Sequence, residues 1–392
     1  MNILFVTDHY LPVVNGVVNQ LIMMRHELEK RGHHVTIIAP QVGTKKEKLT
    51  DPHVIHIRSI PTFWRPHQDR ISLPFSPQLR HQIKMSNFDI VHTHGVFLGT
   101  YGMTIAKEKN IPHIVTLHLT LQEYLGYLAP WIPKITNKLC NVISKLFLDN
   151  FDMIIAPSKK AASTAKKSRT AAPIKIIHNG IQIEGIQNAD PKLFLKKYGM
   201  QPDEPLVIIV GRVDPGKNVH LAIKAMRKVI KKNNRVKLAI IGDGSKRKQC
   251  ETLIEKYGLE KNIFITGFIS YDLVKSATQA CKLAIMTSDS DILPTVAIEA
   301  ISAGKPMVAV NDEAIQEIVH HGVNGILTTK DPEKIAKGIQ KMLENKKLYL
   351  QYAKASLRIS KEFSIETSVN NLEKAYHENI HNYRHEHRHL RG

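Results

Sequence analysis

Two cations flank a tight turn at the point where an apolar run gives way to a helical pattern. The run LVIIVGR occupies residues 206–212, and helical spacing occupies residues 217–232. Arg212 and Lys217 stand on either side of the Pro-Gly turn between them. A loop that enters a helix offers unpaired backbone N–H groups to an anion, and two cations add positive charge. This pattern favours a diphosphate site; the alternative is a surface turn with two solvated cations.

Two carboxylates lie further along the chain, in the segment DILPTVAIEAISAGKP at 291–306. Asp291 follows a strand pattern, whereas Glu299 stands inside an apolar helical run. A carboxylate in such a run is costly to bury unless it is paired. The vicinal hydroxyls of a sugar would suit it, because each carboxylate oxygen can accept a hydrogen bond from one hydroxyl. The alternative is an ion pair between Glu299 and a structural Lys or Arg.

The first half of the chain offers a histidine and a glycine at strand ends. His118 closes the run HIVTLH, and ligand sites of α/β sheets form at the carboxyl ends of strands. Gly16 lies in the first strand-to-helix loop, where a glycine lets the backbone approach a ligand closely. The loop has no Gly-x-Gly-x-x-Gly pattern, and Gly242-Asp243-Gly244 lacks the third glycine. A nicotinamide cofactor is therefore disfavoured.

Two patterns raise the question of a metal ion. His92 and His94 share one face of a strand but have no carboxylate close by in the sequence. Asp289-Ser290-Asp291 resembles the Asp-x-Asp that holds a metal–nucleotide complex in some sugar transferases. It overlaps the Asp291–Glu299 segment, so we interpret it as a coincidence. We expect no metal and no cofactor.

The elements that must position these residues alternate between short apolar runs and helical stretches, and the pattern occurs twice. Near-continuous apolar strands between helices are typical of a parallel sheet covered on both faces. The sequence therefore predicts an α/β protein with two Rossmann-like, doubly wound domains. We expect the first Rossmann-like domain at 1–186, a linker at 187–204 and the second Rossmann-like domain at 205–360. A C-terminal helix at 361–392, with a His-rich tail, is expected to cross back to the first domain.

Composition excludes several classes of protein. The 392 residues are 43% hydrophobic and 23% charged, which excludes a disordered chain or a small disulfide scaffold. Three cysteines without metal or redox spacing favour a reducing cytosol, and we expect neither a signal peptide nor a transmembrane segment. The net charge is +20, and its excess lies within residues 1–250. Such a surface could meet nucleic acid, an anionic membrane or a phosphorylated small molecule.

Taken in order, these motifs resemble the family 4 retaining glycosyltransferases of the GT-B fold, in which two such domains face each other across a cleft. The similarity runs from about residue 2 to residue 375. It rests on the Pro-x-x-Asn-Gly-Val loop at 12–17, Pro157-Ser158, Asn179-Gly180-Ile181, Gly211-Arg212 with Lys217-Asn218, Gly242-Asp243-Gly244, Gly267-Phe268, Glu299-Ala300 with Ala303-Gly304-Lys305-Pro306, and Asn324-Gly325.

The resemblance implies that domain 1–186 binds the acceptor and domain 205–360 binds the nucleotide sugar, and it implies a role for each matching residue. Arg212 and Lys217 would bind the donor diphosphate and stabilise the leaving group, with Gly16 under the phosphate. Glu299 would bind the ribose hydroxyls. Asp291 would face the transferred hexose, and His118 would contact it near the reacting carbon. The remaining donor contacts would come from Gly267, Ile269, Leu293, Pro294 and Thr295.

Two positions depart from the pattern of the family. Asp291 stands where Glu is commoner, and Pro294 stands where a Gly often precedes the backbone that contacts the hexose. Proline removes an N–H group and fixes φ. The identity of the sugar is therefore left open, with a UDP-sugar favoured and GDP-mannose as the alternative.

Within the family, residues 118–127 are most similar to bacterial glycolipid synthases that glycosylate diacylglycerol or phosphatidylinositol. Aromatic and cationic residues also interleave at 63–84, a pattern that suits an anionic bilayer surface; the alternative is a solvated helix with core aromatics. We expect the acceptor and membrane contacts at Trp64, Arg65, Arg70, Phe75, Tyr124 and Tyr127.

The sequence thus predicts a metal-independent, retaining hexosyltransferase. It would use a membrane lipid acceptor such as diacylglycerol, in the cytoplasm and peripherally on the inner face of the plasma membrane. The same chemistry on a soluble, polysaccharide or lipopolysaccharide acceptor is the enzymatic alternative. A basic nucleic-acid-binding protein is the non-enzymatic one; no recognised nucleic-acid module supports it, so we expect no nucleic-acid partner.

Overall fold

The chain folds into two α/β units. The computed structural model describes residues 1–13, 15–41, 51–61, 70–72, 77–95, 98–118 and 137–388. Unit 1 comprises Met1–Gly180 and Ile365–Gly392, and unit 2 comprises Ile181–Ser364. Among the described residues, no helix combines the length and apolar character needed to span a bilayer.

Seven parallel strands form the sheet of unit 1 in the order β3-β2-β1-β6-β7-β8-β9. Nearly every residue of the central strands is buried, which explains their continuous apolar runs. A separate antiparallel pair joins β4 and β5. The strands are β1 (Asn2–Val6), β2 (His34–Pro40), β3 (Val54–Ile57), β4 (Ser59–Pro61), β5 (Arg70–Ser72), β6 (Ile90–Thr93), β7 (His113–Thr116), β8 (Met153–Ala156) and β9 (Ile174–Ile176).

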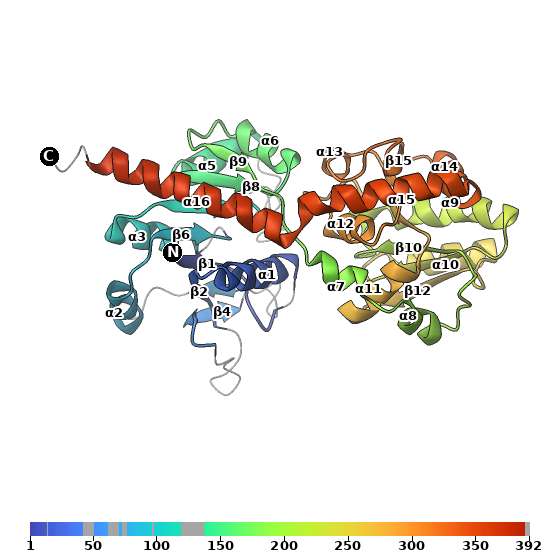
Figure 1. The fold of residues 1–392 in the computed structure, drawn as a ribbon, viewed down its shortest axis with the longest axis horizontal. Helices are drawn as coiled ribbons and strands as arrows, with labels where there is room; N and C mark the ends of the chain where they lie inside the picture. The colour runs from blue at the N-terminus through green and yellow to red at the C-terminus, as the bar shows by residue number, and fades with distance from the viewer. Residues whose placement is uncertain are drawn as a thin grey trace. The chain divides into compact units, whose positions relative to one another are not determined.

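The helices of unit 1 include one from the far end of the chain. They are α1 (Gly16–Lys30), α2 (Pro77–Met85), α3 (Gly99–Lys109), α5 (Asn137–Leu148), α6 (Lys159–Lys167) and α16 (Ile365–Arg388). In Figure 1, α16 runs through unit 1, and it packs beside α1. Its Tyr376 is fully buried, and its Glu373 binds Arg31 at 2.6 Å and His33 at 2.7 Å. The C-terminal helix is therefore part of the core of unit 1.

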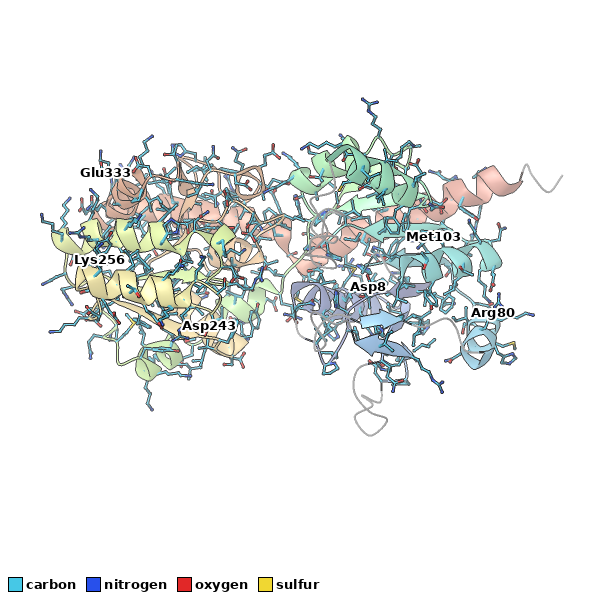
Figure 2. The ribbon with its side chains drawn as sticks, turned by 180° about the vertical axis from the view of Figure 1, so that it is seen from behind. Asp8, Arg80, Met103, Asp243, Lys256 and Glu333 are labelled. Carbon is cyan, nitrogen blue, oxygen red and sulfur yellow. The ribbon has the colours of Figure 1, made fainter. Side chains whose placement is uncertain are left out.

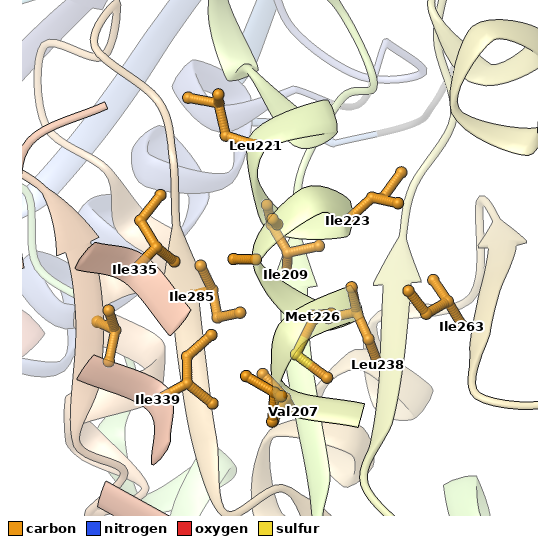
Figure 3. Packing of buried hydrophobic residues seen from close by; sticks show 14 of the residues in the cluster. Val207, Ile209, Leu221, Ile223, Met226, Leu238, Ile263, Ile285, Ile335 and Ile339 are labelled. Carbon is orange, nitrogen blue, oxygen red and sulfur yellow. The ribbon is translucent and has the colours of Figure 1, made fainter. Parts of the chain in front are cut away.

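Unit 2 has a second parallel sheet, in the order β12-β11-β10-β13-β14-β15. Figure 3 shows part of its core, where Met226 of α9 and Ile339 of α14 pack with Val207 of β10. The strands are β10 (Leu206–Val210), β11 (Lys237–Ile241), β12 (Ile263–Gly267), β13 (Leu283–Met286), β14 (Met307–Val310) and β15 (Gly325–Thr328). The helices are α7 (Ile183–Gln187), α8 (Pro191–Lys197), η2 (Pro215–Lys217), α9 (Val219–Lys232), α10 (Arg247–Tyr257), α11 (Tyr271–Ala280), α12 (Thr295–Ser302), α13 (Glu313–Gln316), α14 (Pro332–Glu344), α15 (Lys346–Ser360) and η3 (Lys361–Phe363).

The segment expected as a linker, residues 187–204, folds inside unit 2 instead. Asp190 caps the N-terminus of α8 by accepting a hydrogen bond from the backbone of Lys192 at 2.9 Å, and Pro191 occupies its first turn. Proline at that position favours a helix start, because its missing N–H would have no partner there anyway. Phe194 is fully buried, and α8 packs against α11. The polar and proline-rich composition therefore reflected helix caps rather than a flexible connection.

Both sheets have the strand order of doubly wound folds, and in each the order reverses beside the first strand. The reversal lies between β1 and β6 in unit 1 and between β10 and β13 in unit 2. Ligands of such sheets bind outside the carboxyl ends of the strands at this reversal. In unit 2 the loops that leave these strand ends carry Arg212, Lys217 and Asp291. The topology thus brings together residues that the sequence analysis singled out separately.

Candidate functional site

The loop after β10 turns sharply and enters α9 through the short helix η2. Gly211 has a φ of +140°, which favours glycine. A Cβ atom on Gly242 would lie 2.1 Å from the carbonyl oxygen of Gly211, so the Gly-Asp-Gly motif provides close packing of two loops. The guanidinium of Arg212 lies 3.1 Å from Asp214 and is more than half exposed. This cation is therefore free to turn toward an anion in solvent.

A polar run directly after β13 holds this loop in place. The hydroxyl of Thr287 donates to the carbonyl of Lys217 at 2.7 Å, and those of Ser288 and Ser290 donate to the carbonyl of Gly216 at 3.3 Å. A Cβ on Gly216 would meet the Ser290 hydroxyl at 2.7 Å. Sequence reasoning missed these supports, although three hydroxyl side chains in four residues after a buried strand were a visible signal.

Lys217 and Asp291 form an ion pair across the loops after β10 and β13. The ammonium nitrogen lies 2.5 Å from Oδ1 of Asp291, and both side chains are about three-quarters buried. The other carboxylate oxygen, Oδ2, is buried and has no hydrogen-bond partner among the described residues. A buried acceptor of this kind is costly to leave unfilled. Oδ2 can therefore accept a hydrogen bond from a ligand hydroxyl, while the remaining N–H groups of Lys217 can bind an anion.

Asp289 is held differently from Asp291. It forms an ion pair with Lys330 and accepts a hydrogen bond from Asn218 at 3.2 Å. The hydrogen bond from Lys330 holds the pKa of the Asp289 carboxyl below its usual range. Within the described ranges, no group of three His, Cys, Asp or Glu side chains is arranged to hold a metal ion. The Asp-x-Asp pattern thus contains two carboxylates with separate lysine partners.

Glu299 lies on α12 and is paired with a tyrosine rather than with a cation. The hydroxyl of Tyr271 donates to Oε1 of Glu299 at 3.0 Å, and no ion pair to Glu299 is found among the described residues. Burial raises the pKa of the Glu299 carboxyl to about 7, against a smaller opposite effect of the Tyr271 hydrogen bond. Among the residues that the structure describes, the Glu299 carboxylate thus has a tyrosine partner and not the structural Lys or Arg of the alternative. Nothing in the sequence pointed to Tyr271.

The N-terminus of α12 is built from the residues expected around the hexose. Pro294 caps the helix, and its carbonyl accepts hydrogen bonds from Ala297 at 2.9 Å and Ile298 at 3.4 Å. Proline is tolerated there because the cap residue contributes its carbonyl to the helix. Thr295 begins the helix, and Leu293 packs on the core of unit 2. The unusual Pro294 is thus compatible with the local backbone.

Two of the expected donor contacts, Gly267 and Ile269, lie at the end of β12 and just after it. Gly267 has a φ of +69°, and a Cβ added to it would approach the Arg247 guanidinium at 3.2 Å. Arg247 is itself paired with Asp243 of the Gly-Asp-Gly motif at 2.7 Å. Ile269 packs against the core beside this turn. Glycine at 267 is therefore explained by the backbone alone.

In unit 1, a cluster of three histidines lies at the carboxyl ends of β6 and β7; we call His92, His94 and His118 the histidine cluster. Nδ1 of His94 lies 3.1 Å from Nε2 of His118, and their rings are stacked. His92 is fully buried between the hydroxyls of Tyr376 and Thr116, each at 2.7 Å. Burial, with a smaller effect of His9, lowers the pKa of His118 to about 4. The rings are therefore neutral at physiological pH.

Two further positions complete this edge of unit 1. Asp8, which follows β1 and is labelled in Figure 2, accepts a hydrogen bond from the backbone of Leu98 at 2.7 Å. A Cβ on Gly95 would clash with the Asp8 carboxylate at 2.3 Å. Gly16 begins α1, capped by Asn15, and a Cβ there would meet nothing within 4 Å. The packing of unit 1 therefore does not itself require glycine at position 16.

Most of the expected acceptor and membrane residues lie outside the described residues: Trp64, Arg65, Phe75, Tyr124 and Tyr127. Arg70 is in strand β5, where its backbone pairs with Pro61. The predictions for these positions stay predictions.

Models of known protein families match both units of the chain. The family model described as "Glycosyltransferase Family 4" matches residues 14–184, and that of "Glycosyl transferases group 1" matches residues 192–358. An alpha-monoglucosyldiacylglycerol synthase of Acholeplasma laidlawii is 26% identical over 390 residues, with 96% of each chain covered. A synthase of the same name from Streptococcus pneumoniae is 27% identical, covering 83% of this chain and 75% of that protein.

Solved structures share the fold. The crystal structure of Anabaena HepE in complex with UDP superposes with a TM-score of 0.76 at 21% identity, covering 96% of this chain and 99% of that one. Sucrose-phosphate synthase from Thermosynechococcus elongatus superposes with a TM-score of 0.74 at 18% identity, covering 96% and 98%. Two parallel doubly wound units with these neighbours define a GT-B fold. Because the two family models together match most of both units, the chain belongs to the family 4, group 1 glycosyltransferases, and it is an enzyme of that class.

Proposed function

We propose that this enzyme transfers a hexose from a nucleoside diphosphate sugar, with UDP favoured, to a membrane lipid such as diacylglycerol. The observation that carries the proposal is the Lys217–Asp291 pair, in which a buried carboxylate oxygen lacks a donor beside a cation that can bind phosphate. The names of the two synthases and the UDP complex of the structural neighbour support the same reading.

The diphosphate would lie against the loop after β10. Arg212 is exposed and Lys217 has N–H groups to spare, so both can turn toward an anion. Together with the start of a helix they would neutralise the charge that develops on the leaving group. Gly16 at the start of α1 would leave room for the donor phosphate. This arrangement needs no metal ion to stabilise the departing diphosphate.

The sugar and the nucleoside would be bound by the two carboxylates. Oδ2 of Asp291 would accept a hydrogen bond from a hexose hydroxyl, and Glu299 would accept hydrogen bonds from the ribose hydroxyls. Leu293, Pro294 and Thr295 would line the hexose. Gly267 and Ile269 would contact the base, and His118 would contact the hexose near the reacting carbon.

The chemistry would proceed with retention at the anomeric carbon. The bond between that carbon and the diphosphate oxygen breaks, and its electron pair leaves with the phosphate. The acceptor oxygen forms the new bond on the same face, and its proton passes to the departing phosphate. No side chain of the protein forms a covalent bond in this step. The role of the chain is therefore to position the substrates and to stabilise charge.

An exposed apolar face on α5 supports a lipid surface as the partner. Leu139, Val142, Ile143 and Leu146 are exposed, with Leu146 at 68%, and their spacing places them on one side of the helix. Helix α6, which shares a core cluster with the end of α5, exposes Lys166 and Lys167. Exposed apolar residues together with exposed cations fit an anionic bilayer, and an inner leaflet supplies that charge.

The test is a screen followed by a product analysis. Thermal stability is measured with UDP-glucose, UDP-galactose and GDP-mannose, because a ligand that binds the folded state raises the melting temperature. The stabilising donor is then incubated with vesicles containing diacylglycerol, and the anomeric configuration of the glycolipid is read by NMR. An α-linked lipid from an α-linked donor supports the proposal. Transfer only to soluble acceptors, or a β-linked product, would contradict it.

A further inference from the structure

The histidine cluster contains a buried nitrogen that the reaction described above does not use. His94 is 3% exposed, and its Nδ1 faces Nε2 of His118 at 3.1 Å. Its other ring nitrogen, Nε2, is buried and has no hydrogen-bond partner among the described residues. The rings of His92 and Phe5 pack against the His94 ring, with centroid-to-centroid distances of 3.9 and 5.0 Å.

Only one proton can lie between the two facing nitrogens, so the contact has two possible forms. Burial holds the pKa of His94 well below its usual range, and the pKa of His118 is lowered to about 4. Both rings are therefore neutral, and each carries a single N–H. Either His94 donates from Nδ1 to His118, or His118 donates from Nε2 to His94.

The orphaned nitrogen decides between these forms. If His118 were the donor, His94 would carry its own proton on the buried Nε2, leaving an N–H without an acceptor. If His94 is the donor, its Nε2 holds only an unfilled lone pair. Buried N–H groups without a partner are rarer than incompletely filled acceptors, so the second form is favoured.

We propose that His94 is a positioning residue that donates its Nδ1 proton to Nε2 of His118 and thereby fixes the His118 proton on Nδ1. His118 then presents an N–H donor rather than a basic lone pair at the carboxyl end of β7. Such a group binds a substrate oxygen but cannot remove the proton of the acceptor. This agrees with a mechanism in which the leaving phosphate takes that proton. The role of His118 toward a substrate oxygen rests on the proposed function, whereas the position of its proton does not.

The neighbours of His94 hold its ring in this orientation. His92 is fixed at both nitrogens, by Tyr376 of α16 and by Thr116 of β7, and its ring packs on that of His94. The C-terminal helix thus contributes to the position of His118 through two rings. Tyr376 lies 284 residues from His92 in the sequence, so only the folded unit reveals this connection.

The test uses the full-length enzyme with ¹⁵N-labelled histidine, with the His118 signals assigned by their loss in His118→Asn. In the wild type, the ¹⁵N shifts at neutral pH should show His118 protonated on Nδ1. His94→Leu removes the donor and should move the His118 proton to Nε2. His94→Asn, whose amide nitrogen lies near the Nδ1 position, should keep the wild-type form. A wild-type His118 protonated on Nε2 would overturn the inference whatever the enzyme transfers.

Kinetics add a second readout. Losing one neutral hydrogen bond to substrate should lower kcat/KM of His94→Leu about three- to tenfold, and His94→Asn should restore most of it. His113→Leu is the matched control, because His113 is equally buried, also has an unpartnered nitrogen, and hydrogen-bonds Thr93 rather than His118. An equal loss of activity in both Leu variants would reduce His94 to a packing role. If the tautomer is as proposed but no lipid is glycosylated, the inference stands and the proposed function fails.

Discussion

The lysines and aspartates of the candidate site in unit 2 form ion pairs, whereas the histidines of unit 1 are neutral and buried. Lys217, Asp291, Asp289 and Lys330 form two ion pairs beside the exposed Arg212. The histidine cluster holds no net charge, because burial lowers the pKa of its rings. The contrast indicates a division of labour: one unit is prepared to neutralise an anion, and the other to position a neutral group. Changes in charge should therefore act mainly through unit 2.

The largest effect is expected from the charged pair of unit 2. Lys217→Ala removes a charged contact to the diphosphate and leaves Asp291 without its partner. Charged hydrogen bonds are worth about 1.5–3 kcal/mol, so kcat/KM should fall roughly ten- to hundredfold. The loss of kcat/KM in Arg212→Ala should lie toward the lower end of that range, because the Arg212 side chain is more exposed. Lys228→Ala, which breaks an exposed pair with Glu333, is the control. Full activity in both site variants would refute the assignment of the donor site.

The apolar face of α5 should give the next largest effect. Replacing Leu139, Val142 and Leu146 together by Ser removes exposed apolar side chains that would insert into a bilayer. Binding to anionic vesicles, measured by sedimentation, should therefore weaken about tenfold. Leu350→Ser with Leu357→Ser, exposed on α15 of unit 2, is the matched control. Binding in the wild type should also weaken in high salt. Equal binding to neutral and anionic vesicles would argue against an electrostatic contribution.

Glu299 should make the stability of unit 2 depend on pH. Burial raises its pKa from 4.5 to about 7, so between these values the folded chain binds more protons than the unfolded chain. The stability contributed by Glu299 is then fully present below pH 4.5 and is lost as the pH rises through about 7. Because the side chain is partly exposed, we expect Glu299→Gln to gain only about 1 kcal/mol over the wild type at pH 8.

Urea unfolding of both proteins at pH 5 and pH 8 measures this difference. Glu344→Gln, in an exposed pair with Lys232, should show no such change between the two pH values. The prediction fails if the difference in unfolding free energy between the wild type and Glu299→Gln is the same at pH 5 and pH 8. Ionisation of Glu299 would then cost the folded protein little free energy.

Removal of divalent metal should have the smallest effect. The cations of unit 2 and a helix start would carry the charge neutralisation, and both Asp289 and Asp291 already have lysine partners. Activity measured in EDTA should therefore equal that in untreated enzyme. Complete loss in EDTA with recovery on adding manganese would instead make these two carboxylates metal ligands.

The sequence by itself determined the architecture, because the pattern that encodes it is local. Apolar runs such as LVIIVGR, each followed by a helical stretch, already specify buried parallel strands. The cations at 212 and 217 and the carboxylates at 291 and 299 could be singled out by residue type and spacing. Proline-rich composition was a weaker guide, since Pro191 begins a helix where we expected a linker.

Only the tertiary structure decided which of these residues are partners. Lys217 and Asp291 are 74 residues apart, and Tyr271 and Glu299 are 28 apart; they meet through strand order and helix placement in unit 2. The same holds for Tyr376 of α16, which reaches His92 across most of the chain. Hydrophobic periodicity fixes which face of an element is buried, but it carries no information about which element will cover that face. Pairing across the sheet edge, and with it the unfilled oxygen of Asp291 and the unfilled nitrogen of His94, follows only once the strands are ordered.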